Sequence, residues 1–309
     1  MLRAEIRGAL FLMALALLAA LAAVYITWRV PILPLVQSLR FHLAALLILS
    51  ALLVAAFGGW RRGLWLLLFA GLSIGQGALS IIQRHQTRPA DPPAASLKVL
   101  HFNMNGDNDE NGEAIARMLV TSGADIAVLL EARPVAPHLP DLATRFPYRV
   151  GCDTLQACDL TLLSRFPLSD IRVETLSRFA PNRAILATAD TGGRPLAVAA
   201  IHLTKAYFDD TPHNETEALT RLLKPVTDPL VVTGDFNAAP WSYNLEHLQE
   251  WAGLMPPPSF PATWPPRLDW AGIPIDSAYS RGAVITAISA LPETYGSNHR
   301  ALLTEVALP

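Results

Sequence analysis

A short apolar run near residue 231 ends in two polar side chains whose types and spacing could do chemistry. Residues 231–234 are Val, Val, Thr and Gly, and Asp235 and Asn237 follow on either side of Phe236. The β-branched run predicts a buried strand, and Gly234 lets the backbone turn where the strand ends. Because side chains alternate along a strand, we expect Asp235 and Asn237 to project together into solvent. A purely structural polar turn would look the same.

Polar side chains also lie at the ends of other predicted strands. They are Asn103 and Asn105 at the end of residues 97–103, Glu131 after residues 126–130, His202 at the end of residues 196–202, and Asp276 after Ile275, with His299 near the C-terminus. Oxygen ligands such as Glu131, helped by Asn105, suit Mg²⁺ or a similar hard cation. A cation, carboxylates that orient water and imidazoles that protonate oxygen are what hydrolysis of a phosphate ester requires. Singly, Glu131 could instead cap the next segment and His202 could be a core histidine; the joint pattern favours a catalytic site.

The elements that must position these residues follow residue 96. Strands are predicted at residues 97–103, 126–130, 160–164, 184–189, 196–202, 230–233 and 275–279, and helices at residues 113–122, 215–223 and 244–251. So many strands with so few helices indicate an α/β fold of two packed sheets covered by helices. The proline-rich residues 256–266, with Trp264 and the nearby Trp270, predict an irregular loop. That loop either packs on the surface or forms an aromatic platform for a ligand.

Residues 1–84 predict a membrane region. Uncharged apolar stretches occupy residues 8–27, 43–57 and 63–82, and each approaches the roughly 20 residues that a helix needs to cross a bilayer. Extending the middle stretch brings in Arg40 and His42, which snorkelling to the interface would tolerate. A cleavable signal peptide is the alternative for the first stretch, but its length and the two stretches that follow favour three retained helices.

Residues 85–96 contain Pro89, Pro92 and Pro93 and predict a stiff linker to a soluble domain of residues 97–309. The arginines that flank the three stretches give little bias for orientation. Cys152 and Cys158 are close enough in sequence for a disulfide, which would persist in an oxidising compartment; two unrelated thiols are the alternative. Together these features favour a multi-pass protein of a bacterial cell membrane whose C-terminal domain lies in the periplasm or outside the cell.

Beyond residue 96 the chain has 16 basic and 24 acidic residues, a formal charge of −8. Nucleic-acid binding rests on neutralisation of phosphates by basic residues, and the domain has no general excess of them. Local use of four basic side chains remains open: Arg133, Arg183, Lys205 and Arg300. A small phosphodiester, a lipid headgroup or a cell-envelope phosphate is therefore as credible a substrate as a nucleic acid.

The ordered motifs of residues 97–309 resemble the endonuclease/exonuclease/phosphatase superfamily, which includes pancreatic deoxyribonuclease and neutral sphingomyelinases. They are LKVLHFNMN at 97–105, DIAVLLE at 125–131, LLSRFP at 162–167, Ile201 with His202, GDFNAAPWS at 234–242, Ile275 with Asp276, and SNHR at 297–300. GDFN followed by APWS is specific, and the others are convincing in their order. The resemblance implies a four-layer α/β sandwich and phosphoester hydrolysis that depends on Mg²⁺, Mn²⁺ or Ca²⁺.

The resemblance also implies roles for single residues. Glu131 resembles the family's metal-ligating glutamate, and Asn103 resembles an asparagine that supports metal and phosphate. Asp235 resembles the aspartate that orients or deprotonates the attacking water. The remaining matches are Asn237 and Asn298 at the substrate phosphate, His202 beside the leaving oxygen, and Asp276 with His299, the pair that places an imidazole against a phosphate oxygen.

Two positions depart from the family pattern. Asn298 stands where an aspartate usually precedes the last histidine, and Ser277 follows Asp276 where a histidine or an aromatic residue is common. A neutral carboxamide gives little electrostatic support to an imidazolium. The sequence thus predicts a membrane-anchored phosphoester hydrolase, with a catalytically weakened phosphate-binding or sensor domain as the alternative.

Overall fold

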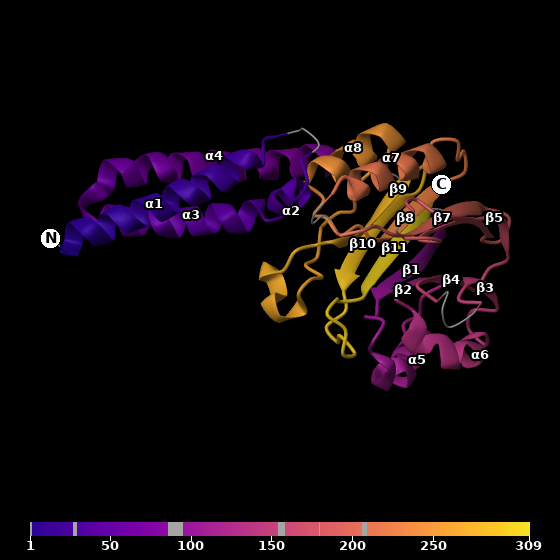
Figure 1. Ribbon diagram of the computed structural model, residues 1–309. Coiled ribbons are helices and arrows are strands. Elements are labelled where there is room, and N and C mark those ends of the chain that lie inside the picture. Colours follow the sequence, from indigo (N-terminus) through magenta and orange to yellow (C-terminus); the bar gives the residue numbers. More distant parts are fainter. Residues whose placement is uncertain (1, 27–29, 86–94, 154–157, 179, 206–208) are drawn as a thin grey trace. The chain divides into compact units, whose positions relative to one another are not determined.

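The computed structural model describes residues 2–26, 30–85, 95–153, 158–178, 180–205 and 209–309. The chain divides into two compact units, which Figure 1 colours along the sequence. The first comprises Met1–Gln86, Ala206–Asp210 and Trp241–Tyr243, and the second comprises Thr87–Lys205, Thr211–Pro240 and Asn244–Pro309.

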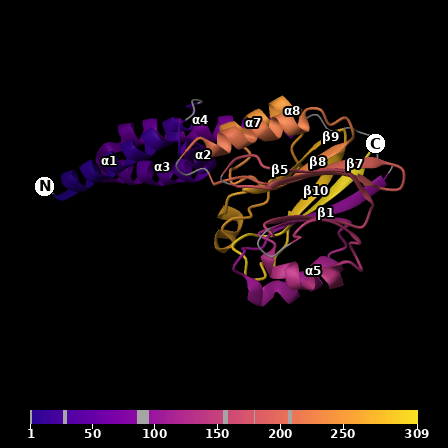
Figure 2. The same ribbon diagram turned by 45° about the vertical axis from the view of Figure 1, so that its right-hand side comes forward.

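Three long helices dominate the first unit. They are α1 (Leu2–Ala23), α3 (Arg40–Val54) and α4 (Trp60–His85), with the short α2 (Leu33–Ser38) before α3, and they lie side by side in Figures 1 and 2. Two continuous stretches, Ala4–Ala23 and Arg40–Ile82, are long and apolar enough to cross a membrane. The second is interrupted by the π-helical segment Ala55–Gly59, where Phe57 and Gly58 have non-helical backbone angles. It therefore consists of two helices, and three membrane crossings remain a prediction.

Arg40 opens the marginal middle stretch, and its side chain is buried. Its Nη2 donates to the Ser73 carbonyl at 2.8 Å and to Gln76 Oε1 at 2.6 Å, and its Nε donates to the Ser73 carbonyl at 3.2 Å. A buried charge is tolerated only where such partners satisfy it. Residues of α4 therefore satisfy the Arg40 guanidinium, and snorkelling of Arg40 to a membrane interface stays a prediction.

The second unit is built on two mixed sheets. The first has the order β10–β11–β1–β2–β4–β3 and the second the order β5–β6–β7–β8–β9. The strands of the first sheet are β1 (Ala95–Asn103), β2 (Ile126–Leu130), β3 (Tyr148–Gly151), β4 (Leu160–Ser164), β10 (Val284–Ala290) and β11 (Leu302–Leu308). Those of the second are β5 (Leu168–Glu174), β6 (Ala184–Asp190), β7 (Pro195–His202), β8 (Leu230–Asp235) and β9 (Asp276–Arg281). Each sheet contains one parallel pair, β1 with β2 and β7 with β8.

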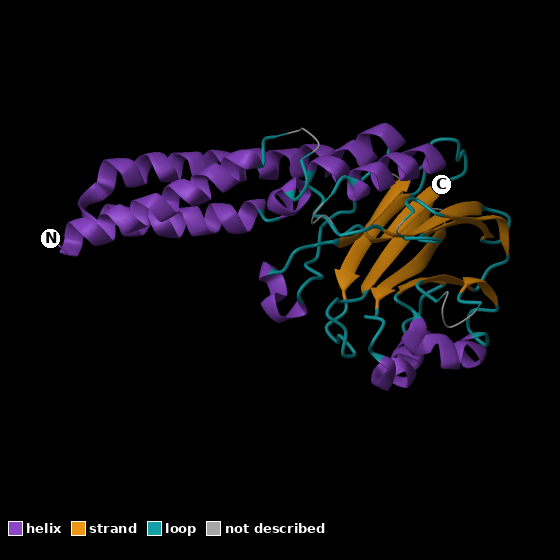
Figure 3. Cartoon of the chain, viewed as in Figure 1, coloured by secondary structure: helices purple, strands orange, loops and turns teal. Residues whose placement is uncertain are grey.

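Alternating side chains place three apolar layers around these sheets. Val99, Val128 and Leu162 of the first sheet pack with Val198 and Val231 of the second in the core between them. Helices α5 (Gly112–Thr121) and α6 (Leu139–Leu142), with the 3-10 segment Arg133–His138, cover the outer face of the first sheet. Helices α7 (Thr211–Leu223) and α8 (Tyr243–Ala252) cover the second (Figure 3). The expected α/β fold, a four-layer sandwich of two packed sheets flanked by helices, is confirmed.

The strands and helices predicted beyond residue 96 are all present, with ends moved by a few residues. Four strands were not predicted: β3, β5, β10 and β11. The predicted linker was two residues too long, because Ala95 and Ser96 already pair with Leu308 and Ala307 of β11. Its prolines, Pro89, Pro92 and Pro93, lie outside the described residues.

Candidate active site

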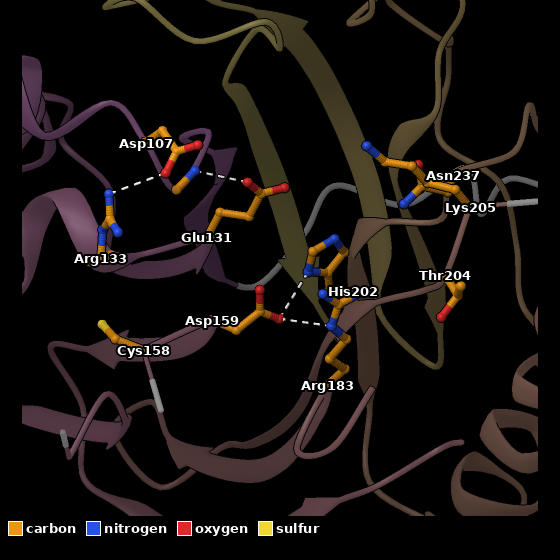
Figure 4. A pocket seen from close by; sticks show the side chains of 11 residues that line it. Asp107, Glu131, Arg133, Cys158, Asp159, Arg183, His202, Thr204, Lys205 and Asn237 are labelled. Atoms are coloured by element: carbon orange, nitrogen blue, oxygen red, sulfur yellow. Dashed lines mark hydrogen bonds and ion pairs between the residues drawn. The ribbon is translucent and has the colours of Figure 1, made fainter. Parts of the chain in front are cut away.

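A cavity of about 510 Å³ lies at the carboxyl ends of the two parallel strand pairs (Figure 4). Parallel strands bring their carboxyl ends to one edge of a sheet, which is where α/β proteins commonly place binding residues. Backbone and side chains from both sheets form its wall: Gly106, Asp107, Glu131, Arg133, Cys158, Asp159, Arg183, His202, Thr204, Lys205 and Asn237.

Asn103, the last residue of β1, joins the two sheets at this edge. Its Nδ2 donates to Asp235 Oδ2 at 3.1 Å and to Glu131 Oε1 at 3.3 Å. Its Oδ1 accepts the backbone N–H of Asn105 at 3.2 Å. One carboxamide therefore holds two carboxylates that lie far apart in the sequence.

Asp235, the last residue of β8, is fully buried, so the expectation that it projects into solvent was wrong. Gly234 lets β7 approach closely, because a Cβ there would collide with the Ile201 carbonyl. Asn237 reaches Asp235 through a turn, since its φ is 49° and its N–H donates to Asp235 Oδ1 at 2.8 Å. Burial, followed by the charge of Asp276, raises the pKa of Asp235 above its usual value, although His299 opposes the rise.

His299 lies between two buried carboxylates. Its Nδ1 is 2.8 Å from Asp276 Oδ2, and its Nε2 is 3.9 Å from Asp235 Oδ2. Burial alone would lower the pKa of the imidazole, but Asp276 first, and then Asp235 and Glu131, raise it to about 9. Burial alone would raise the pKa of Asp276, but the charge of His299 and hydrogen bonds from His101 and His299 lower it. His299 is therefore an imidazolium at neutral pH.

His101 belongs to this cluster, although the sequence analysis did not single it out. Its Nε2 lies 2.8 Å from the other oxygen of Asp276, Oδ1, and its side chain is buried. The available signal was its spacing, because a residue two positions before Asn103 on a strand faces the same side.

His202 lines the cavity and is held by a second carboxylate that the sequence analysis also missed. Its Nδ1 is 3.0 Å from Asp159 Oδ2, and Arg183 Nε is 3.0 Å from the same oxygen (Figure 4). Burial works against ionisation of Asp159, but the hydrogen bond and charge of His202 and the charge of Arg183 lower its pKa. His202 is therefore part of the cavity wall rather than an isolated core histidine.

Glu131 has the position and chemistry of a cation ligand. Its Oε2 accepts the Gly106 N–H at 2.8 Å and its carboxylate reaches the cavity, where Asp107 also lies. It does not cap the following 3-10 segment, whose N-cap is Ala132. Carboxylate oxygens fit Mg²⁺ or Mn²⁺.

A second group has the spacing to hold an ion. Single ligand atoms of Asp235, Asp276 and His299 lie within 4.8 Å of one another. Both oxygens of Asp276 already bond to imidazoles, so a cation there would displace these hydrogen bonds. The Glu131 side of the cavity fits a cation better.

Six of the expected site residues do not line the cavity: Asn103, Asn105, Asp235, Asp276, Asn298 and His299. Asn105 contributes a backbone N–H to Asn103, and Asn298 is exposed. Trp264 and Trp270 do not line the cavity, and the Trp270 side chain is 89% exposed in the 3-10 segment Pro266–Ala271. Three of the four basic candidates do line it, namely Arg133, Arg183 and Lys205, whereas Arg300 bonds to Asp269 at 3.2 Å.

Cys152 and Cys158 are joined by a disulfide, so the expectation of a closed loop holds in the structure. Cys158 lies in the cavity wall directly before Asp159. The disulfide therefore anchors the segment that delivers Asp159 to His202.

A sequence model described as the Endonuclease/Exonuclease/phosphatase family matches residues 100–299. No curated protein matches the chain. Among solved structures, a functionally unknown conserved protein from Enterococcus faecalis V583 is 18% identical, with 69% of this chain and 100% of that chain covered and a TM-score of 0.57.

Two further solved structures carry functional names. A humanized D. rerio TDP2 with 14 mutations is 13% identical, with 68% and 98% of the two chains covered and a TM-score of 0.55. Sphingomyelinase C from Streptomyces griseocarneus is 16% identical, with 70% and 100% covered and a TM-score of 0.51. At these identities the similarity concerns the fold.

Proposed function

The chain belongs to the endonuclease/exonuclease/phosphatase family, and on this premise we propose that it is a membrane-anchored, divalent-metal-dependent phosphoester hydrolase. The observation that carries the proposal is the contact of Asn103 with both Glu131 and Asp235, beside an imidazolium at His299. A cation ligand, a general base and a proton donor are thereby linked by the contacts of Asn103 and by the approach of His299 to Asp235.

The protonation state of each residue determines its role in hydrolysis. Asp235 accepts a proton from the attacking water, for which its raised pKa makes it a stronger base than an ordinary aspartate. The water oxygen forms the new bond to phosphorus as the bond to the leaving oxygen breaks. His299 donates from Nε2 to a non-bridging phosphate oxygen, and His202 lies in the cavity wall to assist the leaving oxygen.

A divalent cation bound to Glu131 would polarise a phosphate oxygen and offset developing charge. We expect the purified full-length protein to hydrolyse bis-p-nitrophenyl phosphate with Mg²⁺ or Mn²⁺ and to lose this activity after EDTA treatment. Glu131→Gln should raise the Mg²⁺ concentration for half-maximal rate by at least about 10-fold, because it removes the ligand charge. Titration of the rate with Mg²⁺ measures this change.

Glu250→Gln, the same substitution on the exposed surface of α8, is the matched control and should leave the Mg²⁺ titration unchanged. A metal-independent rate, or a Glu131→Gln titration that matches wild type, would contradict the assignment of Glu131.

The substrate proposed is a phosphodiester whose cleaved phosphate fits a cavity of about 510 Å³. One similar structure is named a sphingomyelinase, and the formal charge of −8 beyond residue 96 gives no general attraction for nucleic acid. A lipid headgroup, a small phosphodiester, a cell-envelope phosphate and a nucleic acid remain the classes to compare on the purified protein.

We place the hydrolase domain outside the cytoplasm, anchored by the helical unit. The Cys152–Cys158 disulfide supports this location, because disulfides persist in oxidising compartments. A C-terminal alkaline phosphatase fusion, which folds actively only outside the cytoplasm, is expected to be active in intact bacterial cells. A fusion of a reporter active only in the cytoplasm is the control, and activity of that reporter would contradict the proposed orientation.

The structure does not favour the alternative of a weakened sensor domain. The imidazolium of His299 takes its electrostatic support from Asp276 and Asp235, so Asn298 does not deprive it of a carboxylate. Ser277 is buried in β9, opposite Gly234, and its carbonyl accepts the Thr233 hydroxyl at 2.9 Å.

A further inference from the structure

His101 lies in the interior between the two sheets. It is in β1 two residues before Asn103, and its backbone pairs with Val128 on one side and Leu302 on the other. Asp276 opens β9 of the opposite sheet. The 2.8 Å contact between His101 Nε2 and Asp276 Oδ1 therefore crosses the interface between the sheets, where both side chains are at most 1% exposed.

The contact completes a chain of three side chains that ends at the reaction site. Asp276 has its Oδ1 on His101 and its Oδ2 on His299 Nδ1, each at 2.8 Å. Two partners on opposite oxygens fix the rotation of a carboxylate, and the plane of the carboxylate in turn orients the His299 ring. The ring orientation decides where His299 Nε2 points.

The other ring nitrogen of His101 indicates which nitrogen donates to Asp276. Among the described residues, His101 Nδ1 has no hydrogen-bond partner and is buried. An imidazolium would bury an unpaired N–H at this position, which is costly, whereas the neutral ring with its proton on Nε2 leaves only an acceptor unpaired. A proton on Nε2 therefore lets His101 donate to Asp276 Oδ1.

We propose that His101 is a positioning residue for the hydrolysis reaction, which holds Asp276 so that Asp276 aims the His299 imidazole at the substrate phosphate. This inference rests on the proposed hydrolase function. It goes further in making turnover depend on a side chain of the sheet interior that touches neither the cavity nor the substrate.

Two substitutions of similar length distinguish the effect of losing the hydrogen-bond donor of His101 from the effect of losing its side-chain volume. Gln carries an N–H₂ group near the position of His Nε2, whereas Met fills a similar space with no donor. In the full-length protein, His101→Met should lower kcat about 10- to 100-fold, because a small misplacement of a catalytic group has effects of this size. KM should stay within about twofold, because His101 does not contact the substrate. His101→Gln should recover most of the lost kcat.

Val99→Ala is the matched control for general loosening of the sheet interior. Val99 lies on the same strand and face and is buried in the core between the sheets. It should lower the Tm and leave kcat near wild type. If His101→Met behaves like Val99→Ala, or if Gln and Met lose kcat equally, His101 is structural and the proposal is wrong. Should His101→Met fail to fold, His101→Ala replaces it as the variant without a donor.

A spectroscopic measurement separates this inference from the proposed function. The proton resonance of the His299 Nδ1–H bond to Asp276, followed in protein labelled with ¹⁵N-histidine, should shift or broaden in His101→Met and return towards wild type in His101→Gln. If wild type hydrolyses no phosphodiester but this resonance responds as expected, the hydrolase proposal fails and the positioning survives. An unchanged resonance in both variants overturns the positioning itself.

Discussion

Asp235→Asn is expected to lower kcat by about 10²- to 10⁴-fold, the usual contribution of a general base. The substitution keeps the shape of the side chain and removes the charge that accepts a proton from water. Because burial raises the pKa of Asp235 in the folded protein, ionisation of this residue opposes folding at neutral pH. The variant should therefore retain the Tm of wild type or exceed it, while losing turnover.

The measurement is the rate of phosphodiester hydrolysis by full-length protein at saturating Mg²⁺, together with a thermal unfolding curve. Asp170→Asn, on the exposed edge strand β5, makes the same chemical change and should alter neither quantity. Asp235→Asn with a rate close to that of wild type would show that Asp235 is not the base.

The second large effect concerns His299 and pH. We expect kcat/KM to rise with pH as Asp235 loses its proton, at a pH above the ordinary aspartate value of 3.8, and to fall as His299 loses its proton near pH 9. His299→Gln should lower the maximal rate about 10²- to 10⁴-fold and abolish the basic limb, because glutamine does not titrate. A pH–rate profile for both proteins measures the change.

The same raised pKa affects stability with a defined sign. His299 binds a proton more tightly in the folded state than at its ordinary value of 6.5, so its contribution to stability is complete below pH 6.5 and is lost as pH rises through about 9. The Tm of wild type should fall over this interval more than the Tm of His299→Gln. His138→Gln, outside the cavity wall, should follow wild type; a basic limb that persists in His299→Gln would assign that limb to another group.

The strands that carry the site were predictable because their apolar side chains indicate that they are buried. Residues 126–130 and 230–232 are continuous apolar runs, and all the residues of β2 and β8 are buried. The polar residues at their ends, Glu131 and Asp235, converge with Asn103 as expected. The apolar runs predicted the strands. The order of the motifs along the chain predicted that the polar ends of these strands converge.

The unpredicted parts depend on contacts between distant segments. Strand β5 is almost wholly exposed, so it has no apolar alternation to reveal it. The roles of His101 and Asp159 depend on partners 175 and 43 residues away in the sequence, Asp276 and His202. The direction of Asp235 was mispredicted because a strand end looks the same in sequence whether the opposite sheet covers it or not.

The strand formed last in the sequence, β11, lies between β1 and β10 in the interior of its sheet. Strand β1, which carries His101 and Asn103, therefore has an unpaired edge until residues 302–308 have left the ribosome. The sheet that carries His101 and Asn103 is therefore completed by a pairing between the two ends of the domain, from Ala95 with Leu308 to His101 with Leu302. Loss of β11 would leave both β1 and β10 without the neighbour that they share.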